Sequence, residues 1–358
     1  MKITVPAEFD GRILRSYLKN TLGLSSKTLA HLKTLPNGIV VNSSRVTVRY
    51  VLHAGDALEL ADTDTESSEN VTPAPLPLSV LYENEHLIVL DKPPFMPTHP
   101  SHGHTDDTLA NALAYRYEKE GLPFIFRPLG RLDRNTSGVV IAGKTRAASG
   151  ALGNALLRGE VKKRYVALLR GSLCEGDGIH TIEVPIRRAE DSIIIRTACN
   201  MDEAGAEYAL TNYRVLLSNK DYSLVLCEPK TGRTHQLRVH FSHIGHPIVG
   251  DDIYGGDDQG LISRHALHAV SVTVPMPFFR AANGSDATAA PMRDNGLRHG
   301  EGVLSLLSDR LNTPTDDGIL CTFSPIPADM SSLILRLFDG HPELASIRPL
   351  LTESTQRR

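Results

Sequence analysis

An aspartate flanked by arginines stands at the start of an apolar stretch in the segment RPLGRLDRNTSGVVIA, residues 127–142. Asp133 follows Arg131, and two hydroxyl residues and Gly138 come soon after it. Such a carboxylate either caps a turn by accepting backbone N–H groups or acts on a substrate as a nucleophile or base. For a single aspartate the cap is the commoner role. A salt bridge with Arg131 is a third interpretation, because the two residues share one face of an extended chain.

Two further segments combine cations with residues suited to hold a planar ligand. In EVKKRYVALLRG, three cations precede Tyr165, which opens an apolar strand. In EPKTGRTHQLRVH, a Thr-Gly turn leads into a helix that carries Arg238 near its start. Taken alone, Tyr165 is more simply a strand residue beside an exposed basic turn, and Arg238 a structural partner of a nearby acid.

Taken together and in this order, the three segments resemble the signature of the RluA-type pseudouridine synthases, which modify uridines in ribosomal and transfer RNA. That signature reads His-Arg-Leu-Asp-x-x-Thr-Ser-Gly, then Lys-x-Tyr-x-Ala, then Thr-Gly-Arg-x-His-Gln-(Leu/Ile)-Arg-x-His. The flanking VLDKPP, HPIVGD and His268-Ala269 fit it too. The resemblance covers residues 78–282 closely, 319–330 less closely and 1–60 loosely. It departs at Gly130, where many members have histidine, and the departure bears on loop rigidity and RNA contacts.

The resemblance implies a role for each matching residue. Asp133 is the essential carboxylate, either as a nucleophile or as a base on the sugar. Arg238 pairs with it and keeps it ionised and aimed. Tyr165 stacks against the uracil and moves a proton. Leu237 packs beside the base, and Arg131 enters the RNA where the uridine leaves, which offsets part of the cost of extrusion. The remaining candidates for RNA contacts are Arg134, Arg146, Lys162, Lys163, Arg164, Arg233 and His235.

The charge distribution is compatible with a polyanionic partner, although the net charge is −3. Ten basic and two acidic side chains lie in residues 127–170, and eight basic and four acidic ones lie in residues 1–60. Local potential rather than the molecular total governs such a contact. On charge alone, a solvated surface explains the pattern equally well. The resemblance, together with an N-terminal RNA-binding unit in residues 1–60, favours large-subunit ribosomal RNA as the substrate. Transfer RNA is the other candidate.

Several other classes of protein are poorly supported. The chain has no GxGxxG segment, which argues against a dinucleotide-binding enzyme. The four cysteines form no CxxC pair, which fits a reducing cytosol. There is no apolar run long enough for a bilayer and no apolar N-terminal stretch typical of a secretory signal. We therefore expect a cytoplasmic monomer that does not bind membranes.

A dense run of histidines raises the question of a metal site. No carboxylate or thiol has the partner spacing such a site needs, and two of these histidines already fit the RluA-type signature. The implied reaction is an isomerisation, so we expect no redox cofactor, nucleotide or metal. The histidines in question are His235, His240, His243 and His246.

The sequence pattern predicts an α+β fold. We expect a mixed, largely antiparallel sheet in a catalytic domain of the pseudouridine synthase type, spanning residues 77–330 with an insertion at 283–318. Residues 1–60 predict a small α+β unit that resembles the αL RNA-binding domain, with two short helices followed by a small sheet. Residues 61–76 are acidic and proline-rich, and we expect a linker that buries nothing. Residues 331–358 form a C-terminal extension.

Within the catalytic domain, periodicity and capping residues predict individual elements. Helices are expected over residues 108–119 and 146–158 and from about residue 235. A hairpin is expected to join residues 80–83 to 87–90. Further strands are expected at residues 139–142, 165–169, 193–196, 208–217, 224–227 and 319–323.

A different class of function has the same basic segments: a non-catalytic RNA-binding or ribosome-assembly factor with this fold. A pure binding protein has no need to keep Asp133, Tyr165 and Arg238 together. Release of tritium from RNA labelled at carbon 5 of uridine distinguishes the two functions.

Overall fold

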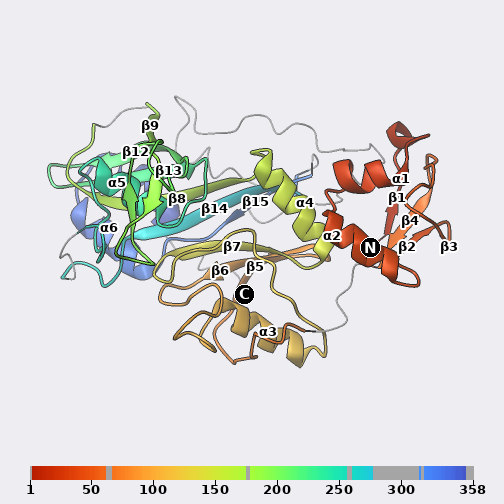
Figure 1. The fold of residues 1–358 in the computed structure, drawn as a ribbon. Coiled ribbons are helices and arrows are strands. Elements are labelled where there is room, and N and C mark those ends of the chain that lie inside the picture. The colour runs from red at the N-terminus through yellow and green to blue at the C-terminus, as the bar shows by residue number, and fades with distance from the viewer. Residues whose placement is uncertain are drawn as a thin grey trace.

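A computed structural model of the chain has a small N-terminal unit and a larger domain built on a nine-stranded sheet, as Figure 1 shows. The predicted α+β class and the largely antiparallel sheet are confirmed. None of the described helices is long and apolar enough to cross a bilayer. The residues that the structure describes are 2–61, 67–174, 178–255, 260–276, 314–315 and 318–351.

The N-terminal unit packs short helices against a four-stranded antiparallel sheet of order β1-β4-β2-β3. Ser25 caps α2 by accepting the N–H of Thr28, as its hydroxyl and position predict. The first predicted helix is a short α-turn that continues as a wider π-turn. The elements are β1 (Lys2–Thr4), α1 (Leu14–Ser16), η2 (Tyr17–Thr21), α2 (Ser26–Thr34), β2 (Ile39–Val41), β3 (Ser44–Arg45) and β4 (Ala57–Leu60).

The large sheet has the order β5-β6-β7-β14-β8-β13-β12-β9, and β15 also pairs with β14. Every pairing in it is antiparallel except that of β7 with β14. The strands are β5 (Ser79–Glu83), β6 (Leu87–Lys92), β7 (Ser137–Gly143), β8 (Lys162–Arg170), β9 (His180–Glu183), β12 (Leu210–Ser218), β13 (Tyr222–Pro229), β14 (Leu267–Pro275) and β15 (Ile319–Phe323).

The pairing of the central strands brings the sequence motifs together. Ala269 of β14 lies opposite Gly138 of β7 on one side and opposite Tyr165 of β8 on the other. The loop that carries Asp133 leads directly into β7, and only β14 separates β7 from β8, the strand that carries Tyr165. The loop and Tyr165 therefore lie at the same level of the sheet. The register therefore positions two of the predicted site residues.

Helices cover the sheet and connect it to the N-terminal unit. Helix α3 (Leu109–Lys119) is capped by Thr108, and α4 (Arg146–Leu157) by Thr145; both helices were predicted. Helix α4 lies between the large sheet and the N-terminal unit (Figure 1). Helix α5 (Gln236–His243) begins at the expected place, and α6 (Ala328–Leu337) and α7 (Leu344–Leu351) end the described chain.

One predicted strand is wrong. Residues 193–195 form the tip of a small separate hairpin rather than a strand, and only β11 (Arg196–Ala198) pairs, with β10 (Ile186–Arg188). The side chains of Ile193, Ile194 and Ile195 are exposed, by 75%, 57% and 40%. An apolar β-branched run predicts a buried strand, but nothing in the described structure covers this one.

The expectation that the linker buries nothing is also wrong for its described part. Val71 packs beside the cluster of α3, and the N–H of Ser68 donates to Phe124 O at 2.9 Å. The side chain of Asn111 donates to Thr72 O at 2.7 Å. Residues 67–75 thus lie along the domain, held mainly by backbone hydrogen bonds that composition does not reveal.

The C-terminal part continues the core. The expected boundary after residue 330 falls inside α6, whose Met330, Leu333 and Ile334 are buried in the largest apolar cluster. The predicted insertion at 283–318 lies almost wholly outside the described residues, but its flanking strands β14 and β15 pair as neighbours.

Candidate active site

The loop before β7 is held by hydrogen bonds that buried cationic side chains donate to backbone carbonyls. Lys92 is fully buried, and its Nζ donates to Met96 O at 2.8 Å and to Arg134 O at 3.1 Å. Arg264, also buried, donates to Asn135 O at 3.2 Å. Since the carbonyls of the two residues that follow Asp133 are held in this way, the carboxylate has a defined position.

Gly138 lets this loop approach β14. Its φ is +108°, and a Cβ there would lie 2.2 Å from Ala269 O. Gly130 also has a positive φ, of +90°, and a Cβ would lie 3.0 Å from Lys163 Nζ. Lys163 Nζ in turn donates to Leu129 O at 2.6 Å. At the position where the family often has histidine, this chain therefore has a left-handed glycine beside a lysine.

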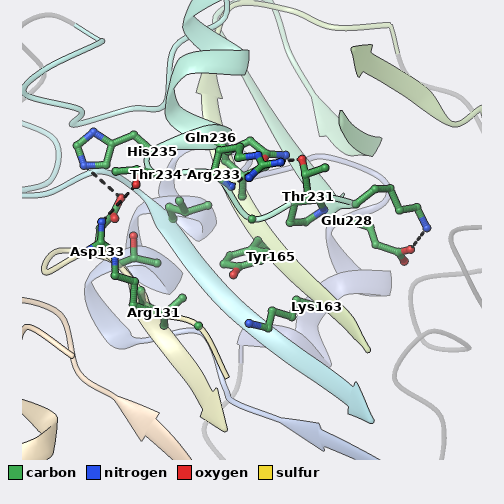
Figure 2. Close-up of a pocket in the computed structure, with 18 of the residues that line it drawn as sticks. Arg131, Asp133, Lys163, Tyr165, Glu228, Thr231, Arg233, Thr234, His235 and Gln236 are labelled. Carbon is green, nitrogen blue, oxygen red and sulfur yellow. Dashed lines mark hydrogen bonds and ion pairs between the residues drawn. The ribbon is translucent and has the colours of Figure 1, made fainter. Parts of the chain in front are cut away.

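Asp133 faces two residues at the start of α5. Its Oδ2 lies 3.8 Å from His235 Nε2 and 3.8 Å from Arg238 Nη1, as Figure 2 shows for the histidine. The Asp133 side chain is 24% exposed, so a substrate can reach it. The backbone carbonyl of Asp133 accepts the N–H of Thr136 at 3.1 Å, so this turn does not use the carboxylate as the cap considered from the sequence would.

Arg238 makes its closest contacts with a different acid from the expected one. Its Nε and Nη2 donate to the two carboxylate oxygens of Asp251, both at 2.7 Å, and Nη2 also reaches Asp252 Oδ1 at 3.2 Å. The guanidinium lies over the ring of Tyr254, 5.1 Å from its centre. Burial disfavours the charge, yet the pKa of Arg238 is raised because Asp251 stabilises it. Arg238 is thus anchored by Asp251 and turns its remaining nitrogen to Asp133.

His235 has a left-handed backbone, with φ of 57°, at the N-cap of α5. Its Nδ1 lies 3.0 Å from the hydroxyl of Tyr254, which leaves Nε2 facing Asp133. Burial lowers the pKa of His235, and Asp133 opposes this effect. The neutral imidazole is therefore favoured near Asp133 at neutral pH.

Tyr165 lies in the same cavity as Asp133 (Figure 2). Burial raises the pKa of the phenol, and the nearby charge of Asp133 raises it further. The phenol therefore stays protonated at physiological pH and can act as a hydrogen-bond donor.

The cavity has a volume of about 380 Å³, within the range of small-molecule sites. One part of its wall is apolar, with Val161, Leu237 and Leu267, and the acid, the phenol and the guanidinium all line it. Flat apolar surfaces beside a few fixed polar groups suit a planar, polar ligand such as a nucleobase.

Among the expected RNA contacts, some side chains are exposed beside this cavity. Arg131 is exposed and donates to Thr234 Oγ1 at 3.2 Å. Arg134 is exposed and donates to Phe95 O. Arg233 forms an ion pair with Glu207 at 3.0 Å and lines the cavity.

Other expected phosphate contacts are placed differently. Arg164 is buried, and its Nε lies 3.4 Å from Glu228 Oε2, so it does not face solvent. Lys162 is buried as well, but it lines the cavity. Burial lowers the pKa of Lys163 to about 8, and its amine points to Leu129 O. In a strand, successive side chains alternate between faces, so three consecutive cations cannot all face the RNA.

Sequence reasoning quoted Asp251 only as part of a flanking motif and missed Tyr254 and Arg264. The sequence signal for Asp251 was its position directly after a glycine. In the structure this glycine, Gly250, has a positive φ of +75°. The histidine run does not converge: His240 bonds to Thr211 and Val184 O, and His246 to Arg170 O. No group of three or more possible ligands in the described part of the chain could hold a metal.

Comparison with known proteins identifies relatives of this chain. Residues 86–243 match the sequence pattern of the RNA pseudouridylate synthase family. The "Uncharacterized RNA pseudouridine synthase YjbO" of Bacillus subtilis is 38% identical over 69% of this chain and 85% of its own length. The "Ribosomal large subunit pseudouridine synthase D" of Nitrosomonas europaea is 32% identical over 77% and 81%. The mitochondrial "tRNA pseudouridine(32) synthase" of Saccharomyces cerevisiae is 33% identical over 63% and 47%.

The chain therefore belongs to the RNA pseudouridine synthase family. Its three motifs place it in the RluA type, and the predicted activity, isomerisation of uridine in RNA, is confirmed by these relatives.

Proposed function

We propose that this enzyme isomerises a uridine of large-subunit ribosomal RNA, with Asp133 as its essential carboxylate. The observation that carries the assignment of roles is that Asp133, Tyr165 and Arg238 line one cavity of about 380 Å³, with Leu237 as its apolar wall. A target uridine must leave its stack to reach such a cavity.

The reaction exchanges one glycosidic bond for another. The bond between C1′ and N1 of uracil breaks, the base turns, and a bond forms between C1′ and C5. The proton on C5 leaves, and N1 gains a proton. Asp133 assists the first step, either by bonding to C1′ or by removing a sugar proton. Arg238, anchored by Asp251, keeps the carboxylate oriented and ionised.

Tyr165 holds the detached base and exchanges a proton with it. Its raised pKa keeps the hydroxyl protonated, so it donates a hydrogen bond to the uracil while the ring packs against the flat base. Val161, Leu237 and Leu267 give the base an apolar surface to pack against during its rotation.

The ribosomal substrate is favoured over transfer RNA by the extent of similarity. The relative named for the large subunit matches over 81% of its length, and the one named for transfer RNA over 47%. We further propose a cytoplasmic monomer, since the residues in these roles all come from one chain and the ribosomal relative is bacterial.

Mapping pseudouridine across all RNAs in a strain that lacks this gene tests the substrate. We expect the loss of a pseudouridine in large-subunit ribosomal RNA, restored by the wild-type gene and not by Asp133→Ala. Loss from transfer RNA alone would contradict the proposed substrate. Restoration by Asp133→Ala would contradict the proposed role of Asp133.

A further inference from the structure

A second cavity, of about 390 Å³, shares Arg131, Leu132, Asp133, His235 and Arg238 with the first cavity. Its remaining lining residues do not line the first cavity. They include His99, Arg134, Ile194, Ile253 and His265. The established reaction acts on one nucleoside, so the first cavity satisfies it and this second space has no assigned occupant.

The outer wall of the second cavity is apolar and exposed. Ile194 at the tip of the β10–β11 hairpin is 57% exposed, and Ile253 is 38% exposed. Ile193, next to Ile194, is 75% exposed. Exposed aliphatic side chains gathered at the rim of a cavity are typical of a surface that is covered in a complex.

The hairpin tip is rigid despite its exposure. Arg196 Nη1 donates to the carbonyls of Ile193, Ile194 and Ile195 at 3.3, 3.1 and 3.2 Å. The hydroxyl of Ser192 accepts the N–H groups of Ile194 and Ile195 at 3.1 and 3.0 Å. The isoleucines are thus presented in a fixed arrangement, which reduces the entropy lost on binding.

Hydrogen bonds connect the hairpin to His235, which faces the catalytic acid. The N–H of Arg196 donates to the hydroxyl of Tyr254 at 2.9 Å, and this hydroxyl lies 3.0 Å from His235 Nδ1. His235 Nε2 then faces Asp133 at 3.8 Å. The hairpin that carries Ile194 is therefore linked to the side chain that faces the carboxylate.

We propose that the second cavity binds the base of a nucleotide adjacent to the target uridine in the same RNA strand, with Ile194 and Ile253 as its apolar wall. The inference rests on the proposed function, because it needs a uridine at Asp133. The two cavities share Asp133, so the strand that delivers the uridine to one passes the other. Arg131 and Arg134, both exposed, supply positive charge for the phosphates between the two nucleotides.

A protein partner is the other class of occupant for exposed isoleucines, but the position favours RNA. A protein seated in this cavity would cover Asp133, Arg131 and His235 and block the substrate. The acid at the rim, Asp252, lies 3.2 Å from Arg238, and the exposed Arg131 and Arg134 add positive charge to the same cavity.

A binding cycle tests the proposal independently of catalysis. All proteins carry Asp133→Asn in the full chain, so that the RNA is bound and not converted. The probes are a synthetic stem–loop with the mapped uridine and two copies with an abasic residue on its 5′ or 3′ side. The variants are Ile194→Ala and, as a control, Leu122→Ala, because Leu122 is also exposed, by 51%, and lines neither cavity.

We expect one abasic RNA to bind about five- to tenfold more weakly than the intact RNA, the scale of one lost base contact. Ile194→Ala should weaken binding of the intact RNA by a similar factor. It should not weaken binding of that abasic RNA any further. Leu122→Ala should match the parent protein on every probe. The proposal is overturned if both abasic RNAs bind like the intact one, or if Ile194→Ala binds every RNA like Leu122→Ala. It is also overturned if Ile194→Ala weakens binding of the abasic RNA by the same factor as it weakens binding of the intact RNA.

Failure of the proposed function gives a different result. It would show as an absence of tritium release from the same intact RNA by the chain with its native Asp133, whatever the binding cycle gives. Unchanged RNA binding by Ile194→Ala would instead leave the isoleucines as a surface for a protein.

Discussion

At the scale of single residues, the site depends on how one guanidinium is held. Arg238 lies between Asp133, the proposed catalytic carboxylate, and Asp251, which is fully buried and bonds to it through both oxygens. The sequence predicted Arg238 and Asp133 as a pair, since both stand in motifs. It did not predict that Asp251 is the closer partner, because the contact spans a turn whose path local pattern does not specify.

Asp251→Asn should destabilise the fold and reduce turnover. The substitution leaves the charge of Arg238 buried without its partner, a change that costs about 3–5 kcal/mol of unfolding free energy. Asp252→Asn is the control, since the Asp252 side chain is 57% exposed and should cost at most about 1 kcal/mol. Urea denaturation measures the unfolding free energy of both variants. Equal losses would show that the buried ion pair of Arg238 with Asp251 stabilises the fold no more than the exposed one with Asp252.

Lys92 gives stability a dependence on pH. Burial lowers its pKa to about 7 in the folded protein, partly opposed by Asp133, against 10.5 for the free side chain. Between these values the unfolded chain binds the extra proton, so stability rises as pH increases from about 7 toward 10. One proton contributes at most about 1.4 kcal/mol per pH unit.

Urea denaturation of wild type and Lys92→Met at pH 7, 8 and 9 measures this contribution. The wild type should gain stability with pH relative to the variant. Parallel pH curves for the two proteins would show that Lys92 keeps its proton over the whole range.

At the scale of elements, the parallel pairing of β7 with β14 aligns Gly138, Ala269 and Tyr165. Strand β14 was not among the expected strands, whereas β7 and β8 were predicted from their apolar runs. Their order was not, because sequence pattern carries no information about which strands pair across a distance of more than 100 residues. The same limit explains the error at Ile193–Ile195, where three β-branched residues predicted a strand and the chain forms an exposed turn.

Gly138→Ala should destabilise the fold by about 1–3 kcal/mol or more, because its φ is +108° and the new Cβ would clash with Ala269 O. Gly153→Ala in α4 is the matched control. It has open space, and alanine should raise helix stability by about 0.5–1 kcal/mol. Thermal denaturation should move the two melting temperatures in opposite directions, and a neutral Gly138→Ala would contradict the close approach of the strands.

At the scale of the whole molecule, the N-terminal unit docks on α4 of the catalytic domain. Asn154 Nδ2 donates to Gly23 O at 3.1 Å, and Ala147 is buried in the apolar cluster of the N-terminal unit. The sequence predicted two units, and it could not predict this contact, since small residues such as Ala147 and Gly150 give no surface signal. The predicted likeness of residues 1–60 to an αL RNA-binding domain stays a prediction.

Gly150→Leu should separate the two units. A Cβ on Gly150 would lie 2.9 Å from Gly23 O, whereas one on Gly153 of the same helix meets nothing within 4 Å. We expect calorimetry to show one unfolding transition for wild type and Gly153→Leu, and two for Gly150→Leu. A single unchanged transition in all three proteins would mean that this contact does not couple the units.

The most direct test of the account is tritium release from RNA labelled at C5 of uridine. Wild type should release tritium from the mapped substrate. Asp133→Asn, which keeps the shape of the side chain, should fall by about a thousandfold or more, the scale of removing an essential catalytic group. Asp221→Asn should stay near wild type, because the Asp221 side chain is 61% exposed and lines neither cavity. Release by Asp133→Asn at the wild-type rate would contradict the central claim that this carboxylate performs the reaction.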